Sequence, residues 1–594
     1  MYTHDDNLFR GLIRMAVQNF YEKYETVLND PKLNPTFDEI LAMDTQAFSE
    51  WVKAFRKAVV HEWDVNGQPP RVGYDKDGII DNFRKLKEHP VATLPIVDLM
   101  TGTKDVIRNT TTFGNAINQW FPTMMKTRIT YSNDVADSKS IYDYFASDDL
   151  LDTFTTYAHR HFHRDSFYHY SAPISVDDDV LKPDGTKLFI VADAEAFINM
   201  FERRRNKPDL ADIEYFFCPV KEDKAYTGFN VALKQKRNLV VTADDIALLS
   251  YKYDIPMKCR TNVTPTSTHY AIRLYKKGQR LFPVGLKAFR VSFCQYAVNF
   301  PPLTARYLYE KYTSHLWTRV SSAGLPLPVI VFDPSAGWGG RLLGAMSVDA
   351  RANLLYVGTD PNSDHNIAGG KTKYHDIAGF FNRHVRESGS LFPSHGHAYH
   401  IFQSGSEEIS KLDDFRRYRG SVDMVFTSPP YFAKEVYSED PEQSCHKFSE
   451  YETWRAGFLE PTLTTAVEWL RPGGYLLWNI ADAVFAGKML PLEQDSKDIL
   501  EKLGMEFVGV EKMTLAQMPG GNRTEETGET EDFIENTLSG TVKTTVAKVK
   551  GKMKNFCMIR PVANKSQTQK SMMLKYEPIF VYRKKVAETT ETKQ

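Results

Sequence analysis

Cysteine is scarce in this sequence, and so are the patterns that would place the chain in a membrane or outside a cell. Five cysteines occur in 594 residues, none in a C-x-x-C pair, and their odd number disfavours a disulfide framework. No apolar run approaches the roughly 18–20 residues that span a bilayer. The first 25 residues carry charges throughout instead of the apolar core of a signal peptide. We therefore expect a soluble cytoplasmic protein without a membrane partner.

An excess of charge of one sign is also missing. The sequence has 74 Lys and Arg residues against 75 Asp and Glu residues, a formal net charge of −1. Any contact with nucleic acid must therefore rest on local basic patches. With 42% hydrophobic and 13% aromatic residues, the composition is that of a folded globular protein. A chain of this length predicts roughly two to four domains.

The chain changes its pattern twice. Residues 1–170 form a mainly helical N-terminal region in our prediction, with helices at 44–63, after an Asp or Thr cap, and at 140–162. Residues 171–295 have a mixed α/β pattern and are the candidate target-recognition region. From residue 296 onward strand-like and helix-like runs alternate, which predicts a doubly wound, mostly parallel sheet. Its seven strand-like runs are at 329–333, 354–360, 399–404, 422–428, 475–482, 506–513 and 578–584.

A glycine-rich turn follows the first of these strands. In "VIVFDPSAGWGGRLLGAM", Gly337 and Gly339 allow positive φ and close approach of a ligand to the backbone, and the following helix begins with unpaired N–H groups. The turn is neither a Walker loop nor a G-x-G-x-x-G fingerprint. Asp360 ends the second strand, where a carboxylate can accept hydrogen bonds from both hydroxyls of a ribose. The turn and Asp360 together indicate a nucleotide-type ligand.

The fourth strand ends in "TSPPY", residues 427–431. Proline cannot donate to a sheet ladder, so the strand must stop there. The loop consequently lies at the carboxyl edge of the sheet, where open α/β sheets bind ligands.

These motifs, in this order, resemble the S-adenosylmethionine-dependent amino-methyltransferases of DNA. The resemblance rests on D-P-S-x-G-x-G at 333–339, the acidic end of strand two and T-S-P-P-Y at 427–431. "NFPPLTARYLYEKY", "LRPGGYLLWNIAD" and "YEPIFVYRK" resemble the family's cofactor-contacting helix, its turn into strand five and its closing strand. The resemblance covers residues 295–515 and 575–585. It implies a Rossmann-like, seven-stranded methyltransferase domain at 296–594, preceded by the helical and mixed regions.

The resemblance also implies the roles of individual residues. S-adenosyl-L-methionine is the expected cofactor, bound by Phe300, Asp333, Ser335, Gly337, Gly339, Asp360 and Ser404, although Ser404 to Glu407 could equally form a simple surface loop. The expected catalytic loop is Ser428, Pro429, Pro430 and Tyr431. An exocyclic amine is a poor nucleophile, and acceptors at Ser428 Oγ and the Pro429 carbonyl would aim its lone pair at the methyl group. Tyr431 would stack on a base flipped out of the duplex.

Ser428 favours N4-cytosine over N6-adenine as the target within the family, and both bases stay open. We expect a site-specific enzyme acting on double-stranded DNA in a bacterial cell, encoded there or by a phage. An RNA amino-methyltransferase and a nucleic-acid-binding protein with a degenerate methyltransferase domain are the alternatives. A homodimer also stays open.

Only two strands and their helices separate the glycine turn from S-P-P-Y, so target recognition is expected within residues 1–295, within the polar insertion at 516–570, or in both. Basic clusters at 203–207, 234–237 and 276–280, with aromatic neighbours, would suit phosphate contact, or form a solvated face. We expect the insertion to be mobile in part. The histidines between His159 and His169 could hold a metal, but surface or phosphate-facing roles are favoured, and we expect no metal site.

Overall fold

The structure is a computed structural model. It describes residues 26–36, 39–40, 42–66, 69–70, 75–129, 138–155, 218–222, 225–230, 280, 297–387, 396–515, 529–537, 540–548, 555–559 and 572–586. The first 25 residues, the histidines from His159 to His169 and nearly all of the basic clusters in 171–295 lie outside the described residues. By their contacts, the described residues within 73–140 and 296–594 form one compact unit. Those within 22–72 and 141–295 form a second unit.

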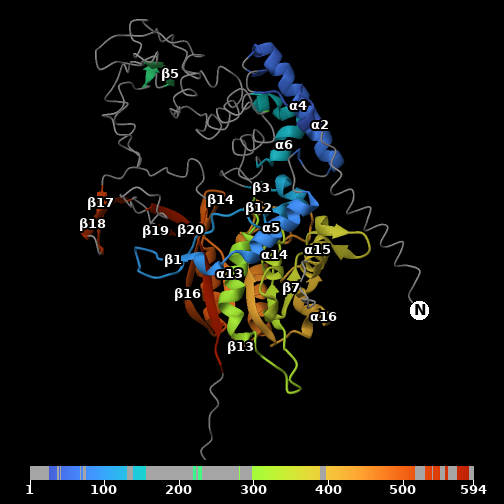
Figure 1. The fold of residues 1–594 in the computed structure, drawn as a ribbon, viewed down its shortest axis with the longest axis vertical. Helices are drawn as coiled ribbons and strands as arrows, with labels where there is room; N and C mark the ends of the chain where they lie inside the picture. The colour runs from blue at the N-terminus through green and yellow to red at the C-terminus, as the bar shows by residue number, and fades with distance from the viewer. Residues whose placement is uncertain are drawn as a thin grey trace, which may run out of the picture. The chain divides into compact units, whose positions relative to one another are not determined.

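The first unit is built on one large sheet (Figure 1). All seven predicted strands are present, in the order β16-β20-β13-β11-β6-β7-β10. They are β6 (Val329–Asp333), β7 (Leu354–Thr359), β10 (Ala398–Phe402), β11 (Val422–Thr427), β13 (Leu470–Asn479), β16 (Met505–Thr514) and β20 (Met572–Lys584). Neighbours from β13 to β10 run parallel, whereas β20 is antiparallel to both β13 and β16. The predicted doubly wound, Rossmann-like methyltransferase sheet is confirmed.

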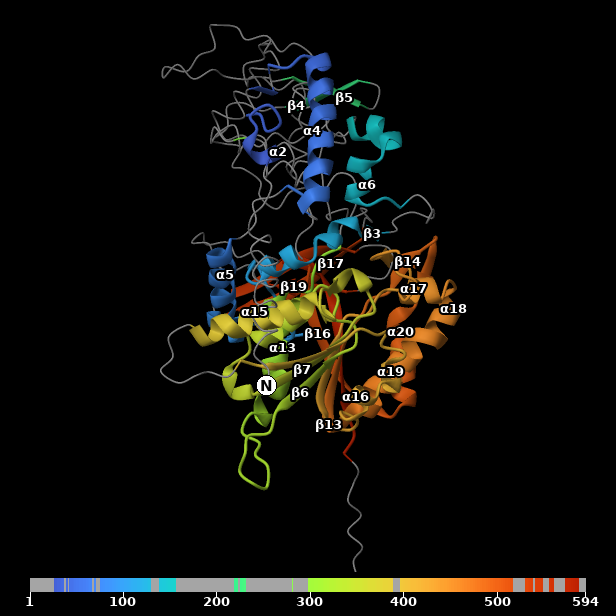
Figure 2. The same ribbon diagram turned by 90° about the vertical axis from the view of Figure 1, so that its right-hand side faces the viewer.

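Helices cover both faces of this sheet (Figure 2). One face packs on α5 (Lys76–Glu88), α13 (Pro302–Thr313), α14 (Gly340–Met346) and α15 (Lys373–Glu387), and the other on α16 (Asp413–Arg416), α19 (Glu460–Trp469) and α20 (Leu492–Lys502). The side chains of the strands alternate between the two faces, so both faces are apolar and need a covering layer. Met424 and Phe426 of β11 point into the first apolar core, and Val422 and Val425 into the second. Every residue of β11 is buried, as expected for a central parallel strand covered on both faces.

The sheet is wider than the seven strands predicted. Strand β2 (Val106–Ile107) pairs in parallel with β16, and β1 (Pro95–Ile96) pairs with β2. Both strands come from the region predicted to be mainly helical. They are only two residues long, too short for a period-2 pattern to be recognised in the sequence. Residues 95–96 and 106–107 of the N-terminal half therefore extend the large sheet of the first unit.

The polar insertion contains regular structure. Strands β17 (Glu529–Thr537) and β18 (Gly540–Lys548) pair antiparallel along their whole length, and β19 (Phe556–Ile559) pairs with β20. The β-branched Thr and Val residues of β18 favour a strand over an irregular loop.

The second unit has its own apolar core. The predicted helix at 44–63 is α4 (Thr45–Asn66), whose N-terminus is capped by Asp44 through a bond from the Ala47 N–H (2.8 Å). Its buried face places Phe55 and Trp63 against Phe145 of α6 (Ile141–Ala146). The predicted helix at 140–162 is interrupted, because α6 ends at Ala146 and a 3₁₀ turn, Asp148–Leu150, follows. Among the described residues of the whole chain, no helix has the length and hydropathy for a membrane span.

Candidate active site

The glycine turn after β6 is shaped by neighbouring backbone. Gly337 and Gly339 have φ of 56° and 70°, the left-handed region that favours glycine. At Gly340 a Cβ atom would lie 2.1 Å from the carbonyl oxygen of Phe300, so the turn admits no side chain there. The side chain of Asn299 stabilises this close approach of the two backbone segments. It accepts a hydrogen bond from the Gly340 N–H (3.1 Å) and donates one to the Trp338 carbonyl (2.7 Å). The segment before α13 thus fixes the turn.

Asp333 lies beneath this turn and is fully buried. Its carboxylate accepts hydrogen bonds from Arg341 Nε (2.8 Å), the Tyr356 hydroxyl (2.7 Å) and Thr427 Oγ1 (2.8 Å). These partners come from α14, β7 and β11. Arg341 also donates to the Ser335 carbonyl. Asp333 therefore joins three strands and the helix under the turn, and does not itself border the cavity described below.

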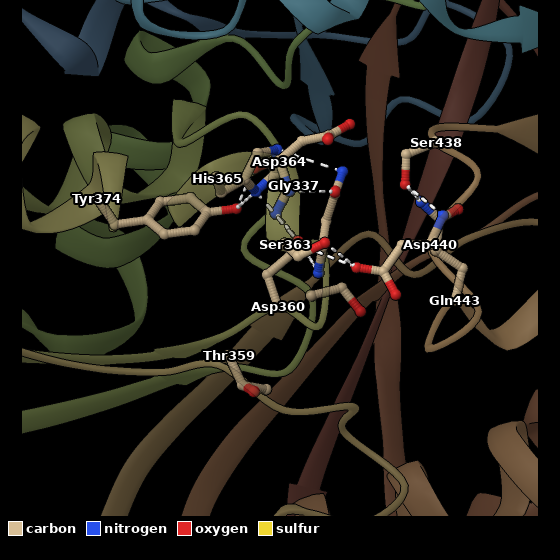
Figure 3. A network of polar contacts seen from close by, with 12 residues as sticks. Gly337, Thr359, Asp360, Ser363, Asp364, His365, Tyr374, Ser438, Asp440 and Gln443 are labelled. Atoms are coloured by element: carbon tan, nitrogen blue, oxygen red, sulfur yellow. Dashed lines mark hydrogen bonds and ion pairs between the residues drawn. The ribbon is translucent and has the colours of Figure 1, made fainter. Parts of the chain in front are cut away.

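Asp360, in contrast, faces the turn directly (Figure 3). Its two carboxylate oxygens accept from the N–H groups of Gly337 (2.9 Å) and Asn362 (3.0 Å). Its side chain is only 13% exposed. Burial raises the pKa of this carboxyl to about 6, an effect that the two N–H groups and the Tyr374 hydroxyl only partly offset. Each carboxylate oxygen retains a second lone pair for an incoming hydroxyl.

A polar network extends from Asp360 to the segment that follows the S-P-P-Y loop. Tyr374 donates to the Gly337 carbonyl and lies 2.7 Å from His365 Nδ1. Burial lowers the pKa of His365 to about 3, so its ring is neutral. Further along, Ser363 donates to Asp440 from its N–H (2.8 Å) and its hydroxyl (Figure 3). The loop after β7 is thereby fastened to residues 438–443.

The S-P-P-Y loop follows β11, which lies beside β6 in the sheet. The chain turns to the opposite half of the sheet between these two strands, and such switch points are where α/β sheets bind ligands. Phe432 has φ of 56°, unusual for a non-glycine residue, and its buried ring packs on Trp454 and Phe485. This packing stabilises the sharp turn after Tyr431. The Tyr431 hydroxyl donates to Glu577 of β20.

The glycine turn and the S-P-P-Y loop border one cavity of about 480 Å³. This volume falls in the range of small-molecule and cofactor sites. Eight of the residues predicted from the sequence line it: Phe300, Ser335, Gly337, Asp360, Ser428, Pro429, Pro430 and Tyr431.

Three predicted residues do not line the cavity. Asp333 lies below it. Gly339 packs instead against the segment of Ile117 and Phe121, whose side chains would lie 3.2 Å from a Cβ atom there. Ser404 accepts a bond from Thr359 through its carbonyl (2.5 Å), while the next residues, Gly405 to Glu407, border the cavity.

Sequence reasoning missed two groups of lining residues. Asn109, Thr111 and Asn115 come from the N-terminal half, about 220 residues before the glycine turn. Glu435, Tyr437 and Glu577 form an acidic, aromatic wall beside Tyr431. Burial raises the pKa of both glutamates. Glu577 stands inside the motif "YEPIFVYRK", which the sequence analysis used only as a strand. No cluster of His, Cys, Asp and Glu suited to a metal ion occurs in the part of the chain that the structure describes.

Comparison with known proteins agrees with this geometry. A family model described as DNA methylase matches residues 422–594, from β11 to the end of the chain. The match confirms, for this C-terminal part, the resemblance to DNA amino-methyltransferases that the motifs predict, and it supports the predicted cofactor. No curated protein matches the chain by sequence.

Solved structures of methyltransferases show weak similarity. A protein named a DNA modification methylase from Thermus thermophilus has 17% identity over 32% of this chain and 54% of that one, with a TM-score of 0.17. An S-adenosylmethionine-dependent O-methyltransferase from Thermotoga maritima has 11% identity over 49% and 68%, with a TM-score of 0.21. This chain thus spans about half the length of the first of these relatives. Scores this low support no conclusion, so the assignment rests on the family match and the site.

Proposed function

We propose that this protein transfers the methyl group of S-adenosylmethionine to an exocyclic amine of a base in DNA. The observation that carries the proposal is the single cavity shared by the glycine turn, Asp360 and the S-P-P-Y loop. A methyl transfer needs a donor site and an acceptor site that face each other across a short gap. The family match at residues 422–594 supports the same class of reaction.

The residues present fit the cofactor. Asp360 offers carboxylate lone pairs for a ribose diol, and Gly337, which borders the cavity, leaves room for a ligand against the backbone. Phe300 and Trp338 contribute apolar surface to the same wall. When bound, S-adenosylmethionine supplies an electrophilic methyl group on a sulfonium. Asn109, Thr111 and Asn115 complete the pocket from the opposite segment, and we assign them to cofactor contact as well.

The S-P-P-Y loop would hold the acceptor. Ser428 Oγ and the Pro429 carbonyl accept from the amine N–H groups, which favours a pyramidal nitrogen with its lone pair directed at the methyl carbon. With the cofactor bound, the amine nitrogen would bond to the methyl carbon, the electron pair of the broken carbon–sulfur bond would stay on sulfur as a neutral thioether, and the surplus amine proton would pass to water. The two prolines restrict the loop, so little reorganisation is needed during the reaction. Tyr431 stacks on the base, which must leave the duplex to reach the cavity.

Ser428 supports N4-cytosine as the target, with N6-adenine as the second candidate. We propose double-stranded DNA as the partner and a site-specific reaction. We propose that target recognition falls to residues 1–295, to the 516–570 insertion, or to both, since the S-P-P-Y loop that would hold the base lies outside them.

Transfer of labelled methyl to unmethylated duplex DNA, with total RNA in parallel, tests the proposal. Ser428→Ala should reduce transfer at least 100-fold, on the order seen when one transition-state hydrogen-bond partner is removed, while cofactor binding stays close to wild type. Ser421→Ala is the matched control, because Ser421 lies at the opposite end of β11 and its hydroxyl donates to the Tyr418 carbonyl (2.8 Å). Label in RNA alone would support the RNA enzyme. Unchanged transfer by the Ser428 variant would refute the loop assignment.

A further inference from the structure

The hydroxyl of Tyr431 is fixed by a residue 146 positions away. It donates a hydrogen bond to Oε1 of Glu577, and both side chains border the cavity. Glu577 is held by its strand, since it pairs with Met513 of β16 in the sheet register. The next residue, Pro578, accepts a bond from the buried side chain of Asn479 (3.0 Å). The acceptor of the Tyr431 hydroxyl therefore stands on the rigid centre of the sheet.

The backbone contacts of the S-P-P-Y loop do not orient the Tyr431 ring. Pro429 and Pro430 have no N–H to donate, and the Tyr431 carbonyl accepts from the Lys434 N–H (3.1 Å), which holds backbone only. The ring packs against the second apolar core, a contact without a preferred direction. The hydrogen bond from its hydroxyl to Glu577 is directional and adds a defined orientation to this packing.

The surroundings of Glu577 are unfavourable for a charged carboxylate. Burial and the nearby carboxyl of Glu435 raise the pKa of Glu577, while the Tyr431 hydroxyl and Lys575 act in the opposite direction. Glu435 is half-buried and accepts a hydrogen bond from the Tyr437 hydroxyl. Two neighbouring carboxyls in one wall are unfavourable for folding, and such arrangements are typical of functional sites.

We propose that Glu577 is a positioning residue for methyl transfer, which orients the Tyr431 ring against the target base. This inference rests on the proposed function and adds a residue of the closing strand to it. Glu577 acts through Tyr431, so it should affect the rate of transfer and leave cofactor affinity unchanged. Removing either partner leaves the ring oriented by apolar packing alone, and misplacement by about 1 Å can cost on the order of 100-fold in rate.

A tyrosine–aspartate pair away from the cavity provides the control. Tyr451 of α18 (Tyr451–Trp454) donates to Asp495 Oδ2 (2.5 Å), and both side chains are half-buried, as are Tyr431 and Glu577. Neither Tyr451 nor Asp495 borders the cavity. Both pairs join a tyrosine hydroxyl to a carboxylate, but only Tyr431 faces the site.

The test compares kcat, KM for duplex DNA and calorimetric affinity for S-adenosylmethionine in purified full-length variants. Tyr431→Phe and Glu577→Met should each lower kcat roughly 10- to 100-fold, and the double variant should be no slower than the slower single one. Glu577→Gln keeps an acceptor and should stay within about threefold of wild type. Tyr451→Phe should leave kcat unchanged.

The inference is overturned if folded Tyr431→Phe turns over at the wild-type rate, or if the two single effects multiply. If Glu577→Met fails to fold, the conservative Tyr431→Phe variant still decides. Absence of transfer by the wild-type protein would instead refute the proposed function, and the inference with it.

Discussion

Asp360 gives a quantitative test of the cofactor site through the substitution Asp360→Asn. The carboxyl is 13% exposed and its pKa rises from 3.8 to about 6 in the folded protein. One pKa unit corresponds to about 1.4 kcal/mol, so keeping this group ionised costs the folded state roughly 3 kcal/mol above pH 6. Asparagine has nearly the same shape and no charge to bury.

The sign follows from proton linkage. Between pH 4 and pH 6 the folded state binds more protons at this position than the unfolded state, so wild-type stability falls as the pH rises through this window. Below about pH 4 the carboxyl is largely protonated in both states, and its ionisation no longer contributes to the free energy of unfolding. The free energy of unfolding of Asp360→Asn relative to wild type should therefore increase by about 3 kcal/mol from pH 3.5 to pH 7.5.

In the wild type the two carboxylate oxygens of Asp360 accept from the N–H groups of Gly337 and Asn362. An asparagine side chain has one oxygen and one NH₂ group, so its NH₂ group must face one of these two N–H donors. That mismatch adds a constant penalty of about 1–3 kcal/mol, which is independent of pH. The buried charge is therefore measured by how the difference in unfolding free energy between Asp360→Asn and wild type changes with pH. Urea unfolding followed by tryptophan fluorescence, at closely spaced pH values, measures it, and carboxyls common to both proteins cancel.

A difference in unfolding free energy that is flat between pH 3.5 and pH 7.5 would refute this reasoning. Under the proposed function the same variant should lose most of its affinity for S-adenosylmethionine at pH 7.5. In the wild type, affinity should weaken as the pH falls below about 6, because the protonated carboxyl accepts hydrogen bonds poorly.

The remaining predictions concern the support of the glycine turn. Arg341→Met leaves the buried carboxylate of Asp333 without its cation, and should lower the free energy of unfolding by about 3–5 kcal/mol in urea titrations. Retention of wild-type stability would show that Asp333 is not charged there. Gly340→Ala should abolish cofactor binding by calorimetry, since its methyl group overlaps the Phe300 carbonyl oxygen, whereas Gly509→Ala, with open space around it, should bind normally.

The sequence predicts the sheet well because its signals are local. The central strands β6, β7 and β11 are apolar runs that end at or near Gly, Pro or Asp, and helix-like segments alternate with the strand-like runs. The order of strands is not local. Strands β6 and β11 are neighbours in the sheet, and the loops that follow them border one cavity. The family resemblance implies this arrangement, but no local pattern in the sequence predicts it.

The position of Asp333 could not be predicted from the local sequence. An acidic residue at a strand end can face a ligand or the interior, and the sequence alone does not decide between them. Here Arg341, Tyr356 and Thr427 satisfy the carboxylate from inside. Asp360 has fewer internal partners and faces the cavity. The difference depends on side chains from three separate elements.

The contributions of the N-terminal half and of β20 were invisible for a similar reason. Asn115 has no motif around it, and it borders the cavity because residues 109–121 pack on the glycine turn. Glu577 reaches Tyr431 because β20 inserts between β13 and β16. Contacts of such long sequence separation leave no periodic signal in the chain.

The most direct test of the central claim is nucleoside mass spectrometry of DNA from a host that makes no methylated bases and expresses this protein. Our account predicts N4-methylcytosine in that DNA, and none when the host expresses Ser428→Ala. N6-methyladenine would correct the assigned base and leave the mechanism in place. DNA free of both modified bases, from cells in which the folded protein binds S-adenosylmethionine, would contradict the account.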